Sequence, residues 1–413
     1  MYLFVLGRNF DLSRAELSQQ AIILEEDREQ AIVFAESLNY QNPRELPKDP
    51  NQLFLNRLGG TIRFAEVLAE DLDLPSLAQK CWSIMEGSRK RKVGFTVFSE
   101  RPKPILAQLI KETKAYGMSM DFNWRVENHQ GKNLNSGQIF ERRLLQKGIE
   151  FICYQRADQS WVLAQTVANQ NLRNYDLRDR KKPWRDPKMG MLPPRLAQVL
   201  VNLAIGTSPK VAQIVDPFCG SGTIPAESAI LGLKTHGSDL NPYFIEGSQK
   251  NFEFLSEKFR FDVSQGKFQA SDVRDLDWEN LSGVVATEGW LGENFEKRPS
   301  RNTIEENAKT VSALWKEIFT KLKDSKIEGL AFCTPAWNFH GQKISISQKV
   351  LEYAAQNGYQ SVKPFNGRDS FIYEREGAFV GREINVVKKV WRISGIFSWL
   401  DDQICLDLKS YKI

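Results

Sequence analysis

A glycine-rich turn between an expected strand and an expected helix constrains the fold of this chain more than any other feature. The turn lies in Val-Asp-Pro-Phe-Cys-Gly-Ser-Gly-Thr, residues 215–223. The β-branched run at 211–215 is typical of a buried parallel strand, and apolar residues recur at helical spacing through 224–233. Such a turn lets a ligand approach the amide groups at a helix N-terminus. A nucleotide-type site is therefore expected, with a turn whose glycines serve only packing as the alternative.

The residue types in the turn favour a cationic ligand over a phosphate. The turn lacks the Gly-x-Gly-x-x-Gly dinucleotide fingerprint and the Gly-Lys-Ser/Thr of triphosphate-binding loops. Asp216, at the carboxyl end of the expected strand, would repel a phosphate and attract an ammonium group. S-adenosylmethionine carries an ammonium, a sulfonium and an adenosine, so it is the ligand that we expect at this site.

Strands and helices are expected to alternate after the turn. The expected strands are 236–239, 267–272, 284–287 and 329–334, and the expected helices are 242–259, 303–322 and 345–356. A further helix, opened by Pro193 and Pro194, is expected just before the turn. This alternation predicts an α/β fold with a largely parallel, doubly wound, Rossmann-like sheet.

Acidic residues follow successive strands, at the edge of the sheet where ligands bind. Asp239 ends the second strand and could accept from ribose hydroxyls, and Asp272 ends the third and could accept from an adenine amino group. Glu288, Gly289 and Trp290 end the fourth and offer a carboxylate, a flexible backbone and a flat aromatic face. Each could instead be a helix cap or a core residue, but their succession favours one S-adenosylmethionine site.

The composition argues against several classes of protein. Among 413 residues, hydrophobic and charged fractions of 41% and 26% are those of an ordinary soluble protein, and a net charge of +5 permits a polyanionic partner without requiring one. The 5 cysteines form no Cys-x-x-Cys pair and there are 3 histidines, so neither a metal site nor a disulfide framework is expected. With no signal-like or membrane-spanning stretch, a cytoplasmic protein is expected.

The chain is long enough for several domains. An α+β region is expected at 1–80, a second β-rich unit at 81–168, a basic linker at 169–188 and the α/β domain at 189–413. Basic residues in the second unit and the linker could contact RNA phosphates, or could simply belong to a solvated edge and a plain linker. The candidate RNA contacts are Arg89, Lys90, Arg91, Lys92, Arg142, Arg143, Lys181 and Lys182.

The turn also carries a family resemblance. Residues 216–223 resemble the first motif of class I amino-methyltransferases, in particular the THUMP-domain-containing tRNA guanosine-N2 methyltransferases that act at position 10, and stretches 4–9, 190–194 and 380–384 are similar to this family too. The resemblance implies a ferredoxin-like N-terminal region, an RNA-binding THUMP domain, a linker and a catalytic domain. It implies these cofactor-binding residues: Pro194, Asp216, Pro217, Cys219, Gly220, Gly222, Thr223, Asp239, Leu240, Asp272 and Val273.

One position departs from the family pattern. These enzymes usually carry Asp-Pro-Pro-Tyr, and some related sequences Glu-Pro-Tyr-Leu-Gly, where this chain reads Glu288-Gly289-Trp290-Leu291-Gly292. We expect Glu288 to accept a hydrogen bond from a guanine amine and Trp290 to stack on an extruded base. We expect Gly289, in the place of a rigid proline, to loosen their alignment.

The expected function is transfer of a methyl group from S-adenosylmethionine to the exocyclic amine of a guanosine in tRNA, giving N2-methylguanosine. One alternative, motivated by Gly289, is an RNA-binding protein that keeps the cofactor pocket but has lost or changed its chemistry. Another is methylation of guanine in ribosomal RNA or of adenine in nucleic acid. The sequence leaves open the target position, mono- or dimethylation, the oligomeric state and the need for a partner subunit.

Overall fold

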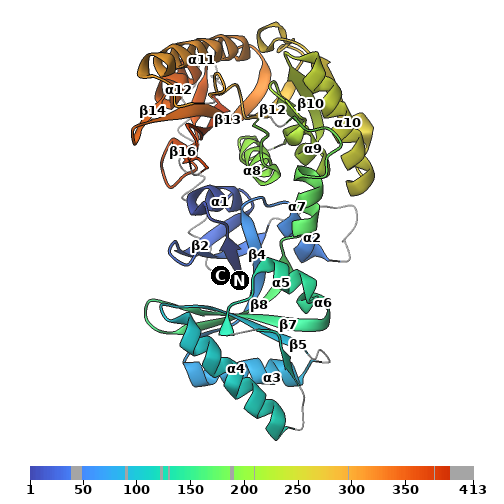
Figure 1. The fold of residues 1–413 in the computed structure, drawn as a ribbon, viewed down its shortest axis with the longest axis vertical. Coiled ribbons are helices and arrows are strands. Elements are labelled where there is room, and N and C mark those ends of the chain that lie inside the picture. The colour runs from blue at the N-terminus through green and yellow to red at the C-terminus, as the bar shows by residue number, and fades with distance from the viewer. Residues whose placement is uncertain are drawn as a thin grey trace, which may run out of the picture.

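The chain folds into two halves, each built around one sheet (Figure 1). The structure is a computed structural model, and it describes residues 1–38, 49–88, 92–120, 124–128, 131–186, 190–208, 210–295, 297–375 and 377–390. Within these ranges no helix is long and apolar enough to cross a membrane. The same ranges contain no group of three or more His, Cys, Asp and Glu side chains that could hold a metal ion.

The N-terminal half is a mixed sheet with the strand order β2-β3-β1-β4-β8-β7-β5-β6. Its strands are β1 (Tyr2–Leu6), β2 (Ala21–Asp27), β3 (Ile32–Leu38), β4 (Thr61–Leu72), β5 (Lys92–Phe98), β6 (Arg125–Val126), β7 (Gly148–Gln155) and β8 (Trp161–Asn169). Its helices are α1 (Phe10–Leu17), α2 (Pro50–Asn56), α3 (Leu74–Glu86), α4 (Pro102–Ser119), α5 (Ser136–Glu141) and α6 (Leu144–Lys147). Helices α3 and α4 lie side by side at the end of the molecule farthest from the C-terminal half.

This sheet contains strands from both sides of the domain boundary that was predicted between residues 80 and 81. Strand β4 of the first predicted unit pairs with β8 of the second, with Arg63 opposite Asn169. Helix α3 crosses the predicted boundary, and its buried Leu77 and Cys81 belong to the same core cluster as Phe95 of β5. We therefore propose that the second unit begins with α3, because the apolar face of this helix is covered by the sheet of that unit.

The predicted linker, 169–188, packs closely on the C-terminal half. Helix α7 (Leu172–Asp179) occupies its first part. The Tyr175 hydroxyl donates to Gln198 Oε1 at 2.7 Å. Arg178 forms an ion pair of 2.5 Å with Glu227, and both side chains are almost completely buried. This part of the segment is therefore a connection between the two halves that is held against the C-terminal half by buried polar contacts.

The C-terminal half contains the expected parallel sheet, and the predicted α/β class is confirmed. The strand order is β11-β10-β9-β12-β13-β17-β15, with β14 paired to β13 and β16 to β17. The strands are β9 (Gln213–Asp216), β10 (Lys234–Asp239), β11 (Gly266–Ala270), β12 (Ser282–Thr287), β13 (Lys326–Phe339), β14 (Gln342–Ser345), β15 (Tyr359–Ser361), β16 (Ser370–Tyr373) and β17 (Val380–Lys389). The helices are α8 (Pro194–Ile205), α9 (Thr223–Ile230), α10 (Pro242–Phe259), α11 (Arg301–Leu322) and α12 (Ser347–Gln356), with 3₁₀ turns η2 (Val263–Gln265) and η3 (Val273–Asp275).

Strands β9 to β13 run parallel, whereas β17 runs antiparallel to β13. Alternate residues of the central strands face opposite cores, as the pleat of a buried strand requires. Val215 and Val285 contact the core that includes α11 and α12. Ile214 and Ala286 contact the core that includes α8 and α9. The sheet is thus covered on both faces, and the parallel strands bring their carboxyl ends to one edge.

Polar contacts join the two halves beside α8. The buried carboxylate of Glu16 accepts from the N–H groups of Gly59 at 2.8 Å and Gly60 at 2.7 Å, and from the Asn202 side chain at 2.6 Å. Burial raises the pKa of Glu16 to about 7. These hydrogen bonds fix the N-terminal half against the helix that precedes the glycine-rich turn.

Candidate active site

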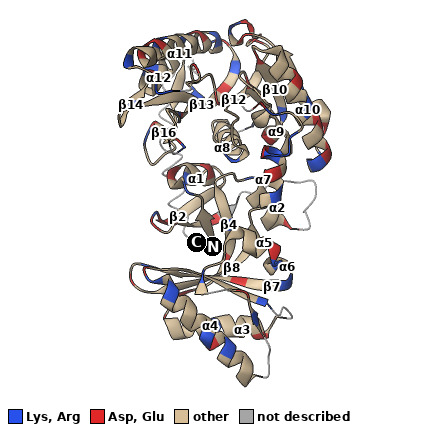
Figure 2. Ribbon diagram, viewed as in Figure 1, with Lys and Arg blue, Asp and Glu red and all other residues tan. Residues whose placement is uncertain are grey.

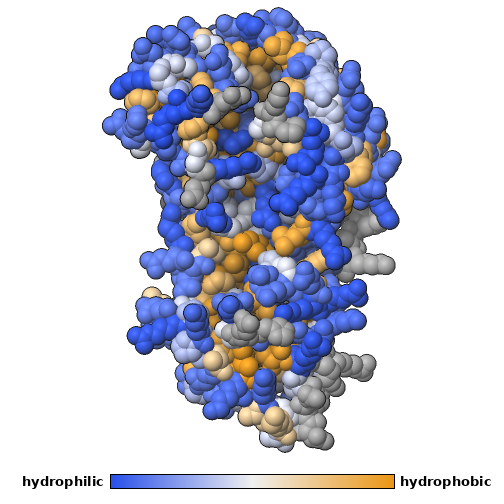
Figure 3. Space-filling model, viewed as in Figure 1, coloured by the Kyte–Doolittle hydropathy of each residue, from blue (hydrophilic) through white to orange (hydrophobic). Residues whose placement is uncertain are grey.

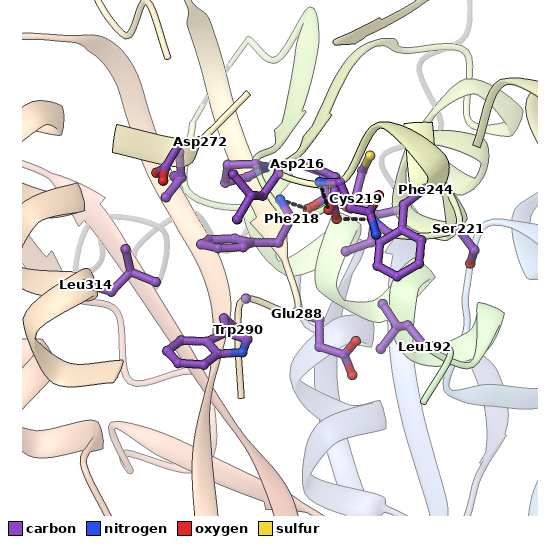
Figure 4. Close-up of a pocket in the computed structure, with 18 of the residues that line it drawn as sticks. Leu192, Asp216, Phe218, Cys219, Ser221, Phe244, Asp272, Glu288, Trp290 and Leu314 are labelled. Atoms are coloured by element: carbon purple, nitrogen blue, oxygen red, sulfur yellow. Dashed lines mark hydrogen bonds between the residues drawn. The ribbon is translucent and has the colours of Figure 1, made fainter. Parts of the chain in front are cut away.

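A cavity of about 940 Å³ lies at the carboxyl ends of β9, β10 and β12 (Figure 4). Its size is that of sites for small organic ligands and cofactors. It brings together most of the residues that the sequence selected for cofactor binding and catalysis: Asp216, Pro217, Cys219, Gly220, Thr223, Asp239, Leu240, Asp272, Val273, Glu288, Gly289 and Trp290. Residues that are far apart in the sequence therefore share one cavity, because the parallel strands end at the same edge of the sheet.

The glycine-rich turn forms one wall of the cavity and is tied to the neighbouring strand. Gly220 and Gly222 have positive φ angles of 49° and 75°. The Gly220 N–H donates to Asp239 Oδ2 at 3.0 Å. A Cβ atom at Gly222 would lie 3.1 Å from the Ser248 Cβ. Gly220 is thus part of the cavity wall, whereas Gly222 serves the close packing of the turn on α10.

Asp216 is a buried carboxylate at the end of β9. Its Oδ1 accepts from the Thr287 hydroxyl at 2.7 Å and from the Phe218 N–H at 3.2 Å. Burial raises the pKa of Asp216 to about 7. No Lys, Arg or His of the described residues forms an ion pair with it. A carboxylate in this position favours a ligand that carries a positive charge, since such a ligand would offset the cost of its burial.

Asp239 and Asp272 differ in how much of their hydrogen-bonding capacity is used. Asp239 accepts from the N–H groups of Gly220 and Asn241, both at 3.0 Å, and burial raises its pKa. Both oxygens of Asp272 contact Arg274, at 2.9 Å and 2.6 Å, and these hydrogen bonds lower the pKa of Asp272. Asp239 keeps lone pairs for a ligand hydroxyl, whereas an adenine amine would compete with Arg274 for Asp272.

Glu288 and Trp290 lie across the cavity from Asp216 (Figure 4). The Glu288 carboxylate forms an ion pair with Arg382 of β17. Burial raises the pKa of Glu288, and Arg382 opposes this rise. Trp290 lines the cavity and packs against the core cluster that contains Trp315. A carboxylate and an aromatic face therefore line the same cavity.

Gly289 occupies a position that neither proline nor a residue with a Cβ atom fits well, and the looser alignment expected of it stays a prediction. Its φ is +72°, which proline, locked near −65°, cannot adopt. A Cβ atom at this position would lie 2.9 Å from the Trp315 ring and 3.1 Å from the Cys333 carbonyl oxygen. The Gly289 N–H donates to the Thr287 hydroxyl at 3.1 Å, and that hydroxyl donates to Asp216. Glycine is the residue that permits this turn.

Replacing Gly289 by alanine should therefore destabilise the protein in two ways. The left-handed backbone costs an alanine roughly 1–2 kcal/mol, and the Trp315 ring and the Cys333 backbone would have to move. Gly341→Ala is the matched control, because Gly341 has φ +84° with no atom near its Cβ position. Chemical denaturation should give a larger loss for Gly289→Ala than for Gly341→Ala. Equal losses would show that the space around Gly289 is not restrictive.

The cavity also has apolar walls that the sequence analysis did not select. Leu192, Phe218, Phe244 and Leu314 line it, from the segment before α8, the turn, α10 and α11. Pro194 is not among the lining residues, because it begins α8 and the chain leaves the cavity there. The resemblance of 190–194 to the family indicated the right segment, but the lining comes from its first residues.

The predicted RNA contacts have different environments. Lys182 is 5% exposed, and its Nζ lies 3.1 Å from Thr223 Oγ1 and 3.4 Å from Ser221 Oγ, so its prediction as a surface contact is wrong. Lys92 and Arg142 both form ion pairs with the buried Glu127. The remaining candidates are Arg143 and Lys181, which are exposed, and Arg89, Lys90 and Arg91, which lie outside the described residues.

Charge does not single out one half of the molecule as the RNA-binding part. Basic and acidic residues are spread over both halves (Figure 2). On the face drawn in Figure 3 the surface is mostly hydrophilic, with apolar side chains gathered over the N-terminal sheet.

The fold and the cavity define the class of protein. A Rossmann-like parallel sheet, a glycine-rich turn after β9 and acidic strand ends are the features of a class I methyltransferase domain. Residues 182–300 match the model of the family UPF0020, described as RMKL-like, methyltransferase domain.

Two curated relatives and a solved structure extend this comparison. The tRNA (guanine(10)-N2)-dimethyltransferase of Methanothermobacter thermautotrophicus is 22% identical over 220 residues, which are 53% of this chain and 54% of that protein. A protein of the same name from Pyrococcus abyssi is 39% identical over 67 residues, 16% of this chain and 19% of that protein. The crystal structure of TrmN from Thermus thermophilus matches with a TM-score of 0.51 and 15% identity, over 94% of this chain and 99% of TrmN. This chain thus covers about half of the Methanothermobacter relative, and the likeness to TrmN shows a shared fold.

Proposed function

We propose that this protein transfers a methyl group from S-adenosylmethionine to the exocyclic amine of a guanosine in tRNA. The observation that carries the proposal is the shared cavity, in which the buried Asp216 faces the pair formed by Glu288 and Trp290. The names of the two curated relatives support guanine N2 of tRNA as the target and position 10 as its site. The cytoplasm is the proposed compartment, in line with free thiols at Cys81, Cys153, Cys219 and Cys333.

The residues around the cavity fit S-adenosylmethionine. Asp216 would take the ammonium group, because it is a buried carboxylate without an ion-pair partner among the described residues. Asp239 would take the ribose hydroxyls, and Leu240 and Val273 would contact the adenine. When bound, S-adenosylmethionine supplies an electrophilic methyl group.

Glu288 and Trp290 would act on the guanine. The lone pair of the guanine amine is delocalised into the ring, so the amine needs a hydrogen-bond acceptor and a fixed orientation. Glu288 would accept from the amine and take up the proton that it loses, and Trp290 would stack on the base. Alignment of two reactants can contribute roughly 7–11 kcal/mol, and the hydrogen bond from the Gly289 N–H to the Thr287 hydroxyl would help to preserve that alignment.

The N-terminal half would bind the tRNA. Flipping a paired guanosine costs a few kcal/mol, and contacts from a separate part of the protein can offset this cost. The halves are joined by Glu16 and by the ion pair of Arg178 with Glu227, so the RNA-binding part would sit in a fixed position relative to the cavity. We propose that this half comprises the ferredoxin-like region and the THUMP domain.

Binding of S-adenosylmethionine should strengthen as the pH rises from 6 to 8. Burial raises the pKa of Asp216 to about 7, and only the ionised carboxylate attracts the ammonium group. The affinity should be about tenfold higher at pH 8 than at pH 6. Calorimetry in buffers of different ionisation enthalpy should detect proton release on binding near pH 6.5. An affinity that does not change with pH, or that matches the profile of Asp216→Asn, would contradict this assignment.

The burial of Lys182 predicts that it stabilises the fold and does not contact RNA. Lys182→Ala should lower the free energy of unfolding by about 1–3 kcal/mol, because it removes a donor from the hydroxyls of Ser221 and Thr223. Its exposed neighbour is the control, and Lys181→Ala should change stability by less than about 0.5 kcal/mol. RNA affinity should fall only for Lys181→Ala. A loss of RNA affinity in a folded Lys182→Ala protein would contradict the structural role.

The function is tested by incubating the protein with labelled S-adenosylmethionine and unmodified tRNA, followed by digestion and mass spectrometry of the nucleosides. N2-methylguanosine or its dimethyl form at position 10 is the expected product. Ribosomal RNA and DNA in parallel reactions separate the alternative substrates. Cofactor binding with no methylated nucleoside from any RNA or DNA would indicate a protein that has kept the pocket and lost the chemistry.

A further inference from the structure

Arg382 was not among the residues selected from the sequence, yet it contacts the proposed catalytic carboxylate. It lies on β17, opposite Pro335 of β13 and Tyr373 of β16. Its Nε donates to Glu288 Oε1. The pair is largely buried, with 11% of the Arg382 side chain and 20% of the Glu288 side chain exposed. Because strands pair on both sides of β17, the position of Arg382 along the sheet is fixed.

The groups around Glu288 make the positive charge of Arg382 important for keeping the Glu288 carboxylate ionised. Asp216 brings a second carboxylate to the cavity, and the buried Cys333 thiol and the Tyr373 hydroxyl lie on neighbouring strands. Arg375 also acts on Glu288, but it is exposed, and water screens its charge. Arg382 therefore supplies the buried positive charge that opposes protonation of Glu288. A protonated carboxyl could not take up the proton that the amine loses.

Arg382 also joins two walls of the cavity. Its Nη2 lies 3.4 Å from the carbonyl oxygen of Gly190, in the segment that leads into α8. Glu288 and Gly190 both line the cavity. The guanidinium group therefore fixes the end of β12 relative to the segment that carries Leu192. Within the described residues, Oε2 of Glu288 has no hydrogen-bond partner.

We propose that Arg382 is a positioning residue for the methyl transfer, which keeps Glu288 ionised and leaves its Oε2 for the substrate amine. This role rests on the function proposed above. It requires both the charge of Arg382 and the planar guanidinium, since one group must reach Glu288 and the Gly190 carbonyl together. Lysine at this position would preserve the charge and lose the second contact.

The test compares Arg382→Met, Arg382→Lys and the double variant Arg382→Met/Glu288→Gln with the unaltered protein. Arg382→Met should lower kcat by at least about 100-fold, while the Kd for S-adenosylmethionine stays within threefold. The kcat of Arg382→Lys should lie between those of Arg382→Met and the unaltered protein. Arg375→Met is the matched control, because it removes an exposed cation that also acts on Glu288, and it should retain kcat within threefold. A folded Arg382→Met protein with kcat within threefold of the unaltered protein would overturn the proposal.

Infrared spectroscopy provides a readout that does not depend on turnover. At neutral pH the unaltered protein already has protonated carboxyl groups, because the pKa values of Asp216 and Glu16 are about 7. Arg382→Met should show one further protonated carboxyl band, which should be absent from the unaltered protein and from the double variant. Absence of this band in Arg382→Met would show that Glu288 stays ionised without Arg382, and would overturn the proposal. If the unaltered protein methylates no nucleic acid, the proposed function fails, and the infrared comparison still decides whether Arg382 sets the charge of Glu288.

Discussion

Asp216→Asn is expected to weaken binding of S-adenosylmethionine by about 30-fold to 3,000-fold. Removing one partner of a buried, hydrogen-bonded charge pair costs about 2–5 kcal/mol, and 1.4 kcal/mol corresponds to tenfold in affinity. The carboxylate is 2% exposed, so water cannot replace it as a partner for the ammonium group. Isothermal titration calorimetry at pH 8, where Asp216 is ionised, measures the full effect.

The design of this variant separates charge from structure. Asparagine keeps an oxygen that can accept from the Thr287 hydroxyl, so the turn should remain in place. Burial raises the pKa of Asp216 from 3.8 to about 7 in the folded protein. Ionisation of this group therefore reduces the stability of the ligand-free protein progressively as the pH rises from about 4 to 7, and Asp216→Asn should be at least as stable as the parent at pH 8.

A ligand without the amino acid end provides the second control. Methylthioadenosine retains the adenosine and lacks the ammonium group, so it should bind the parent and Asp216→Asn with the same affinity. A parallel loss for both ligands would mean that the substitution disturbs the whole cavity. An unchanged affinity for S-adenosylmethionine would remove Asp216 from the site.

The sequence predicted the centre of the C-terminal half well, because the strands, turn and helices there are each indicated by residues close together in the sequence. A β-branched run, a glycine-rich turn and an amphipathic helix can each be recognised from a few neighbouring residues. Asp216 and Asp239 are the last residues of strands β9 and β10. In a parallel sheet the ends of these strands must meet at one edge. The placement of Asp216, Asp239 and Glu288 around one cavity follows from this rule without knowledge of any side-chain contact.

Contacts between distant segments were beyond the reach of the sequence. Arg382 and Lys182 belong to residue types that usually lie at the surface. The family resemblance of stretch 380–384 marked the segment of Arg382, but it did not indicate that this side chain contacts Glu288. Arg382 meets Glu288 because β17 inserts antiparallel beside β13. The pairing of β4 with β8 likewise joins segments that the sequence assigned to separate units. Antiparallel strand pairs of this kind join segments that are far apart in the sequence, so the local sequence pattern does not predict them.

Gly289 illustrates a different limit. From the sequence, a glycine in place of a family proline suggested a looser backbone. The φ of +72° and the nearness of the Trp315 ring show a further reason for glycine, because the position excludes proline and larger residues. A glycine can occur where other residues do not fit, or where a flexible backbone is tolerated. The sequence alone does not distinguish these two cases.

Glu288→Gln is expected to lower kcat for methyl transfer by about 100-fold to 10,000-fold, the range of general acid and base catalysis. Glutamine preserves the shape of the side chain, but it carries no charge and cannot take up the proton of the amine. The Kd for S-adenosylmethionine should change by less than threefold, because Glu288 lies across the cavity from Asp216. Single-turnover kinetics with bound tRNA measure the chemical step directly.

Glu293→Gln is the matched control for Glu288→Gln, since Glu293 follows on the same loop and is exposed. It should retain kcat within threefold. The two cavity variants then give opposite patterns: Asp216→Asn loses cofactor affinity and should recover part of its rate at saturating S-adenosylmethionine, whereas Glu288→Gln binds the cofactor normally and should recover nothing. A Glu288→Gln protein with kcat within tenfold of the parent would show that positioning alone drives the reaction and that the acceptor is not this carboxylate.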